Sequence, residues 1–188
     1  MKGTEIMAML NTQERYGSLS IAMHWLMLIL MVLVYTTVEL HELFDKGSEP
    51  RDLLKSLHFM FGMSIFFLVW IRLALRFMGP SPAISPTPAN YQKKAATVMH
   101  IALYGLMIIT PFMGWLLLSS VGRPVPFFGI ELPTLIAENE EIKPLIKEIH
   151  QTIGSTGYYL IALHAVAALF HHYVQKDNTF TRMLPSKR

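Results

Sequence analysis

Four histidines lie inside long apolar stretches, where an ionisable side chain is costly and usually has a function. They are His24, His58, His150 and His164. His150 and His164 are 14 residues apart, which is nearly four helical turns, so both imidazoles face the same side of one helix. At a rise of about 1.5 Å per residue their axial separation is about 21 Å. Gly157 lies midway on the same stripe, where the missing side chain leaves room for a flat macrocycle.

Each of these two depths is matched by a histidine from another stretch. Successive stretches cross the membrane in opposite directions, which puts His24 level with His164 and His58 level with His150. Two facing neutral imidazoles can bind one iron, each through one nitrogen, while the other N–H donates to a nearby acceptor. The pattern predicts two six-coordinate b-type haems and an electron path across the bilayer. Two alternatives stay open: histidines that only hydrogen-bond between helices, and a zinc site, which needs three or four ligands at one level.

The histidines belong to a chain with four apolar stretches that are long enough to cross a bilayer, for which about 20 residues are needed. The stretches run over Leu19–Val38, Leu57–Met78, Thr97–Leu118 and Ile149–Tyr173. Only 15% of the residues are charged, against about 25% in soluble domains. We predict an all-α membrane protein, a four-transmembrane-helix bundle in a single domain over residues 1–188. The first stretch is interpreted as a retained span, not a cleaved signal peptide.

Composition and loops narrow the function further. The absence of cysteine excludes disulfides, iron–sulfur clusters and haem attached through thioethers. The expected surroundings are a lipid bilayer, and no nucleic-acid partner is expected. The proline-rich segment Gly79–Asn90 is predicted to be extended, and the longest loop, Ser119–Glu148, has room for a short interfacial helix.

Basic residues indicate the orientation. Lys and Arg number 10 on the side of both termini and 6 on the other side, so the positive-inside rule puts both termini in the cytoplasm. With the acidic residues included, the inner segments sum to +7 and the outer loops to −4.

Several other residues have two or three interpretations each. His171 is either a hydrogen-bond partner or proton donor for a quinone, or an interfacial histidine in contact with water. His100 is an alternative ligand to His24, a quinone-site residue, or structural. For Arg72 and Arg76, one turn apart, we favour snorkelling and topology setting over pairing with haem propionates.

Several segments resemble the bacterial cytochrome b561 family, and the resemblance covers essentially the whole chain in the same order. They are IAMHW at Ile21–Trp25, SLHFMFG at Ser56–Gly62, HQTIGSTGYYLIALHA at His150–Ala165 and LHAVAALFHHYVQKDNTFTRMLP at Leu163–Pro185. The run Lys176–Thr179 after the double histidine is quite specific.

The resemblance implies a four-helix inner-membrane cytochrome with two non-covalent haem b groups and electron exchange with ubiquinone. By position it implies axial ligands at His24, His58, His150 and His164, and it puts His171 at a position associated with quinone. Close relatives act as superoxide oxidases: superoxide gives its electron at the outer haem, and quinone is reduced near the inner side.

Three hypotheses for the function follow. The first is a di-haem cytochrome of the bacterial inner membrane that oxidises superoxide or an unknown periplasmic donor and reduces ubiquinone, acting as a superoxide:ubiquinone oxidoreductase. The second is a haem-containing anchor and electron conduit for a partner dehydrogenase or hydrogenase, with the acidic outer loops as a docking surface. The third is a non-redox membrane protein with structural histidines. A superoxide anion gains from a positive entrance, which Lys55 and Lys147 could supply locally.

Overall fold

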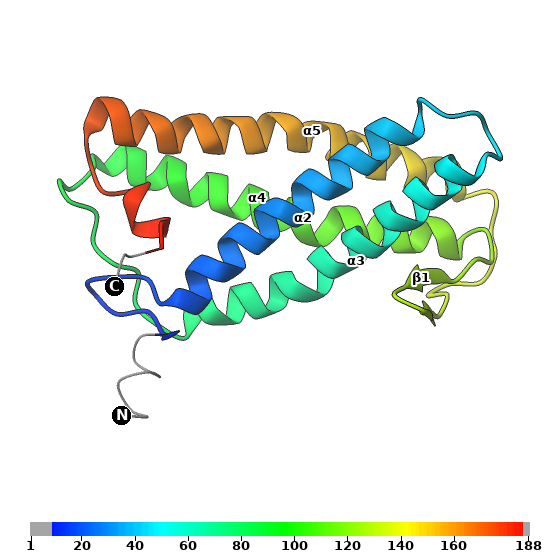
Figure 1. The fold of residues 1–188 in the computed structure, drawn as a ribbon, viewed down its shortest axis with the longest axis horizontal. Helices are drawn as coiled ribbons and strands as arrows, with labels where there is room; N and C mark the ends of the chain where they lie inside the picture. Colours follow the sequence, from blue (N-terminus) through cyan, green and yellow to red (C-terminus); the bar gives the residue numbers. More distant parts are fainter. Residues whose placement is uncertain (1–8, 186–188) are drawn as a thin grey trace. The chain divides into compact units, whose positions relative to one another are not determined.

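Four long helices dominate the computed structural model, which describes residues 9–185 (Figure 1). They are α2 (Ser18–His41), α3 (Glu49–Phe77), α4 (Asn90–Ser119) and α5 (Lys143–Phe170), and a π-helical turn (His171–Gln175) continues α5. In the described part of the chain, these four are long and apolar enough to cross a membrane. The predicted all-α, four-helix membrane fold is confirmed.

The helices extend beyond the apolar stretches that predicted them. The first turn of α3 carries Glu49 and Asp52, which lie eight and five residues, respectively, before the predicted start at Leu57. Acidic side chains stabilise the positive end of a helix dipole, so the helix continues into a polar segment that hydropathy alone would leave out. Along the spans, Ile29, Ile101 and other large apolar side chains are more than half exposed. Lipid can cover such a surface, whereas water would make it an aggregation site.

The chain forms two compact units, and each contains one segment of every long helix. Unit 1 comprises Met1–Leu26, Trp70–Tyr104 and Gly157–Arg188, and unit 2 comprises Met27–Val69 and Gly105–Thr156. The buried apolar residues of unit 2 include Met63, Ile65 and Val69. Each histidine pair predicted from the sequence therefore lies within a single unit.

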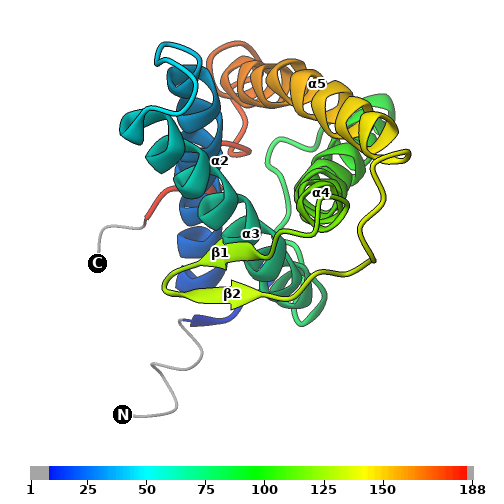
Figure 2. The same ribbon diagram turned by 90° about the vertical axis from the view of Figure 1, so that its right-hand side faces the viewer.

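The long loop of unit 2 contains a β-hairpin instead of the short interfacial helix for which it has room. Strands β1 (Val125–Phe127) and β2 (Ile130–Leu132) pair antiparallel (Figure 2), and helix resumes only at Lys143. Phe128 and Gly129 both have positive φ, which is the backbone of a two-residue hairpin turn that suits twisted strands. The Phe127 ring packs edge-on against Phe67, with centroids 5.6 Å apart.

The C-terminal segment of unit 1 folds back onto the other parts of that unit. Lys176 adopts a left-handed conformation after the π-helical turn, and the Met183 carbonyl then accepts a 2.7 Å hydrogen bond from Trp25 Nε1. Asn178 exchanges hydrogen bonds with the backbone of Ser85. Ser85 lies in the stretch that is non-helical over residues 79–89, as predicted. Four of the charged residues counted for the predicted orientation, Lys2, Glu5, Lys187 and Arg188, lie outside the described residues.

Candidate functional site

In unit 2, α3 and α5 bring two of the predicted histidines close together. The rings of His58 and His150 have centroids 6.3 Å apart and an interplanar angle of 79°. Both side chains are partly buried. The two helices thus present imidazoles to each other inside the bundle rather than to lipid.

Backbone carbonyls determine which nitrogen of each ring is available in this pair. His58 Nδ1 lies 3.1 Å from the Val34 carbonyl oxygen, and His150 Nδ1 lies 2.9 Å from that of Thr110. A carbonyl can only accept a hydrogen bond, so in the neutral rings Nδ1 carries the proton and Nε2 keeps its lone pair. That is the arrangement in which a metal-binding histidine is oriented by its second nitrogen.

A glycine of α4 makes room for the His150 ring. A Cβ at Gly114 would lie 3.1 Å from His150 Cε1 and 3.4 Å from its Nδ1, closer than ordinary contacts. The glycine predicted from the sequence to leave room was Gly157, whereas Gly114 was not predicted. No sequence signal could have found Gly114, because only the packing of α4 against α5 brings it under the His150 ring.

The spacing of the rings fits two ligands of one metal ion. A metal–imidazole bond is about 2.0–2.1 Å long, and the ring centre lies about 1.1 Å behind the nitrogen, so two opposed imidazoles put their centroids roughly 6.2–6.4 Å apart. Among residues 9–185, no group of three or more His, Cys, Asp or Glu side chains could hold a metal ion. Two axial imidazoles without further protein ligands are the donor set that suits the iron of a porphyrin.

In unit 1, the second pair has the same spacing and an additional histidine beside it. The centroids of His24 and His164 are 6.3 Å apart, with an interplanar angle of 66°. His100 of α4 also faces His164, with centroids 5.9 Å apart. The geometry therefore brings His24 and His164 together and leaves His100 adjacent to the same ring.

Arg72 departs from the expected snorkelling role. One guanidinium nitrogen of Arg72, Nη2, lies 2.9 Å from His24 Nδ1, and the side chain is partly buried rather than extended to the membrane surface. Arg72 also interacts with Tyr104. Arg76, one turn further on, is exposed, which agrees with snorkelling. Sequence spacing could not separate the two arginines, because only helix packing decides which of them faces His24.

His171 lies in the π-helical turn and contacts a carboxylate that the sequence analysis did not assign. Its Nδ1 is 2.5 Å from Asp177 Oδ2, and Asp177 Oδ1 accepts the Thr179 N–H at 2.8 Å. Burial raises the pKa of Asp177, but the hydrogen bonds from His171 and Thr179 outweigh it and hold that pKa below its usual value. The one available signal was an acid six residues after the histidine.

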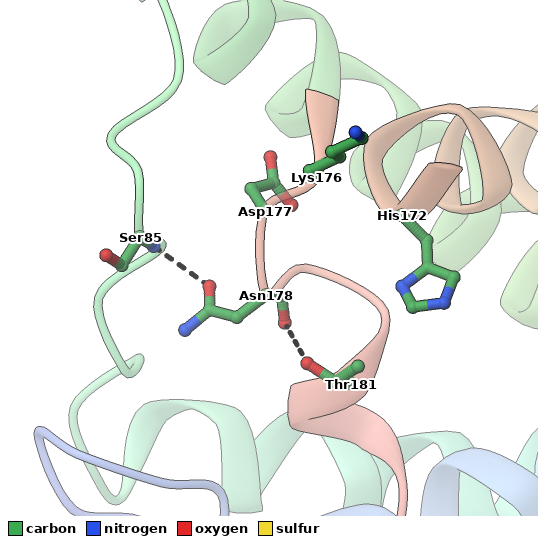
Figure 3. Close-up of a pocket in the computed structure, with 6 residues that line it drawn as sticks. All are labelled: Ser85, His172, Lys176, Asp177, Asn178 and Thr181. Atoms are coloured by element: carbon green, nitrogen blue, oxygen red, sulfur yellow. Dashed lines mark hydrogen bonds between the residues drawn. The ribbon is translucent and has the colours of Figure 1, made fainter. Parts of the chain in front are cut away.

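Asp177 also borders a polar pocket at this end of α5 (Figure 3). The pocket has a volume of about 380 Å³ and is lined by Ser85, His172, Lys176, Asp177, Asn178 and Thr181. His172 is partly buried, with its ring 5.3 Å from that of Phe180, so the two adjacent histidines have different surroundings.

Four membrane-spanning helices with facing imidazoles between them are typical of an integral membrane cytochrome. The chain belongs to the prokaryotic cytochrome b561 family, whose sequence model matches residues 15–186. It is 40% identical over 175 residues to cytochrome b561 homolog 1 of Escherichia coli (strain K12), covering 93% of this chain and 99% of the relative. It is 34% identical over 175 residues to the probable superoxide oxidase CybB of Yersinia pestis, covering 93% and 98% respectively. The protein is thus a multi-pass inner-membrane haem protein of electron transfer, and its family implies b-type haem.

Proposed function

We propose that the protein carries electrons through two b haems from a periplasmic donor, superoxide, to ubiquinone. His58 with His150 would hold one haem, and His24 with His164 would hold the other. The observation that carries the proposal is the spacing of 6.3 Å in both pairs. The relative named a probable superoxide oxidase supports the choice of donor.

The residues around the His58–His150 pair orient the two imidazoles that would hold a haem and affect their basicity. Bound haem supplies reversible one-electron chemistry. The carbonyls of Val34 and Thr110 fix both ring orientations through Nδ1–H and make each imidazole a more basic ligand. Gly114 leaves the space that the His150 ring occupies.

The overall reaction balances without covalent chemistry on the protein. Two superoxide anions lose one electron each and leave as dioxygen, and one ubiquinone takes up both electrons and two protons to become the quinol. We assign delivery of a proton to His171, whose Nδ1 is held by Asp177. In the proposed orientation both termini, and therefore quinone reduction, lie on the cytoplasmic side.

A second candidate is an electron conduit for a partner dehydrogenase or hydrogenase. The observation that favours it is the charge of the predicted outer loops, which sum to −4. A negative surface repels superoxide and attracts a cationic protein surface. In that case the donor is the partner, not a small anion.

Haem content is the first experiment. A pyridine haemochrome assay on the purified full chain is expected to give two haem b per chain. His164→Ala is expected to remove one and His150→Ala the other, so each variant retains about half of the haem. Loss of haem in His100→Ala but not in His24→Ala would contradict the assignment of His24.

The donor is tested with the same preparation. The purified protein with added ubiquinone is expected to consume superoxide and form one quinol for every two superoxide ions. A haem-replete protein that leaves superoxide untouched refutes the first function and supports the conduit. A colourless preparation refutes both.

A further inference from the structure

The two histidine pairs differ in the groups that lie next to Nδ1, the ring nitrogen that would not bind metal. In the His58–His150 pair, both Nδ1 atoms face backbone carbonyls, which only accept hydrogen bonds. In the His24–His164 pair, His24 Nδ1 faces the Arg72 guanidinium, which only donates and stays charged at any relevant pH. One pair is therefore surrounded by neutral acceptors, and the other lies beside a permanent cation.

The charge of Arg72 reaches the whole pair. Electrostatic interactions join Arg72 to both His24 and His164. His58 instead interacts with the Val34 carbonyl, His150 and His41, and His150 interacts with the Thr110 carbonyl. Charge effects are strong at partly buried sites because little water screens them.

We propose that Arg72 is a positioning residue that makes an iron bound by His24 and His164 easier to reduce than one bound by His58 and His150. The inference rests on the proposed di-haem function. Reduction of ferric to ferrous iron removes one positive charge, so a neighbouring cation favours the reduced state. Nδ1–H donation to carbonyls acts in the opposite direction at the other pair, because a more basic imidazole favours the ferric state.

The guanidinium also has a partner that keeps it in place when His24 binds metal. Binding through Nε2 puts the proton of a neutral ring on Nδ1, where it cannot accept a bond from Arg72. The Tyr104 hydroxyl, which already interacts with Arg72, can accept that bond instead. The cation then remains beside the ring, and electrons collect at the His24–His164 site.

Redox titration of single-site proteins tests this. His58→Ala with His150→Ala leaves one site, and His24→Ala with His164→Ala leaves the other. The first protein is expected to have the higher midpoint potential. In it, Arg72→Gln is expected to lower the ratio of reduced to oxidised haem at least tenfold at a fixed ambient potential, which is 59 mV for one electron.

Three controls separate charge from structure. Arg72→Lys keeps the cation, so its ratio of reduced to oxidised haem is expected to stay within threefold of the parent's ratio. The same result is expected for Arg72→Lys if Arg72→Gln loses its haem and gives no ratio. Arg76→Gln, at the exposed neighbour, is expected to change the ratio less than threefold. Arg72→Gln in the protein that retains His58 and His150 is expected to change nothing.

Some outcomes overturn the inference and leave the di-haem proposal intact. They are a higher potential at the His58–His150 site, equal effects of Arg72→Gln and Arg76→Gln, or a lysine variant that keeps its haem but loses as much potential as the glutamine variant. The absence of haem from the wild-type chain, measured beforehand, refutes the proposed function itself.

Discussion

Gly114→Ala should weaken the haem site formed by His58 and His150. The added Cβ would lie 3.1 Å from His150 Cε1, so the ring must retreat by about 0.4 Å or more to reach an ordinary carbon–carbon distance of about 3.5–4.0 Å. That movement strains the 2.9 Å hydrogen bond to the Thr110 carbonyl, and metal ligands are held within about 0.2 Å.

The magnitude follows from the cost of an extra methyl group at a packed position. Such overpacking costs about 1–3 kcal/mol, which corresponds to roughly 5- to 150-fold weaker binding. The helix itself gains, because alanine is favoured over glycine by up to about 1 kcal/mol in a helix interior. Haem loss without loss of helix stability is therefore the expected signature.

The assay is the rate of haem transfer to excess apomyoglobin, measured in the His24→Ala, His164→Ala background so that one site remains. Gly105→Ala is the matched control on the same helix, since a Cβ there would meet only Ile109 Cδ1 at 4.0 Å. If Gly114→Ala releases haem no faster than Gly105→Ala, the packing argument is refuted. Equal loss from the His24–His164 site in the reciprocal background would show a general defect instead.

Two further predictions concern the ends of the helices. Arg51 is 6% exposed and donates 2.8 Å hydrogen bonds to the carbonyls of His41 and Phe44. Arg51→Gln should therefore lower the free energy of unfolding, measured by thermal denaturation, by about 2–4 kcal/mol. Arg123→Gln, at an exposed position, should leave the free energy of unfolding unchanged. At Asp177 the lowered pKa means that stabilisation of the C-terminal turn is complete above about pH 4 and is lost as the pH falls through the folded-state value. Hydrogen exchange at the Thr179 amide should show constant protection from pH 7 to 5 and a decline below pH 4. Asp177→Ala, which removes the acceptor of the Thr179 N–H, should leave that amide unprotected throughout, and a decline already at pH 6 contradicts the reasoning.

The sequence by itself determined the four spans and the level of each histidine. Hydrocarbon forces a backbone to satisfy its own hydrogen bonds, so apolar length translates directly into helix. The constant rise of a helix then converts the 14 residues between His150 and His164 into two depths. Both inferences use properties of one helix at a time, which is why they needed no packing information.

Contacts between helices were decided only by the tertiary structure. Whether Arg72 meets lipid headgroups or His24, and whether Gly114 lies under the His150 ring, depends on how each helix is rotated about its axis. Successive residues of a helix are about 100° apart around its axis. No pattern within a single apolar span shows which of these directions faces a neighbouring helix. The hairpin at Val125–Leu132 and the return of Asp177 to His171 depend likewise on a few residues with positive φ and on a π-helical turn, which leave almost no trace in hydropathy.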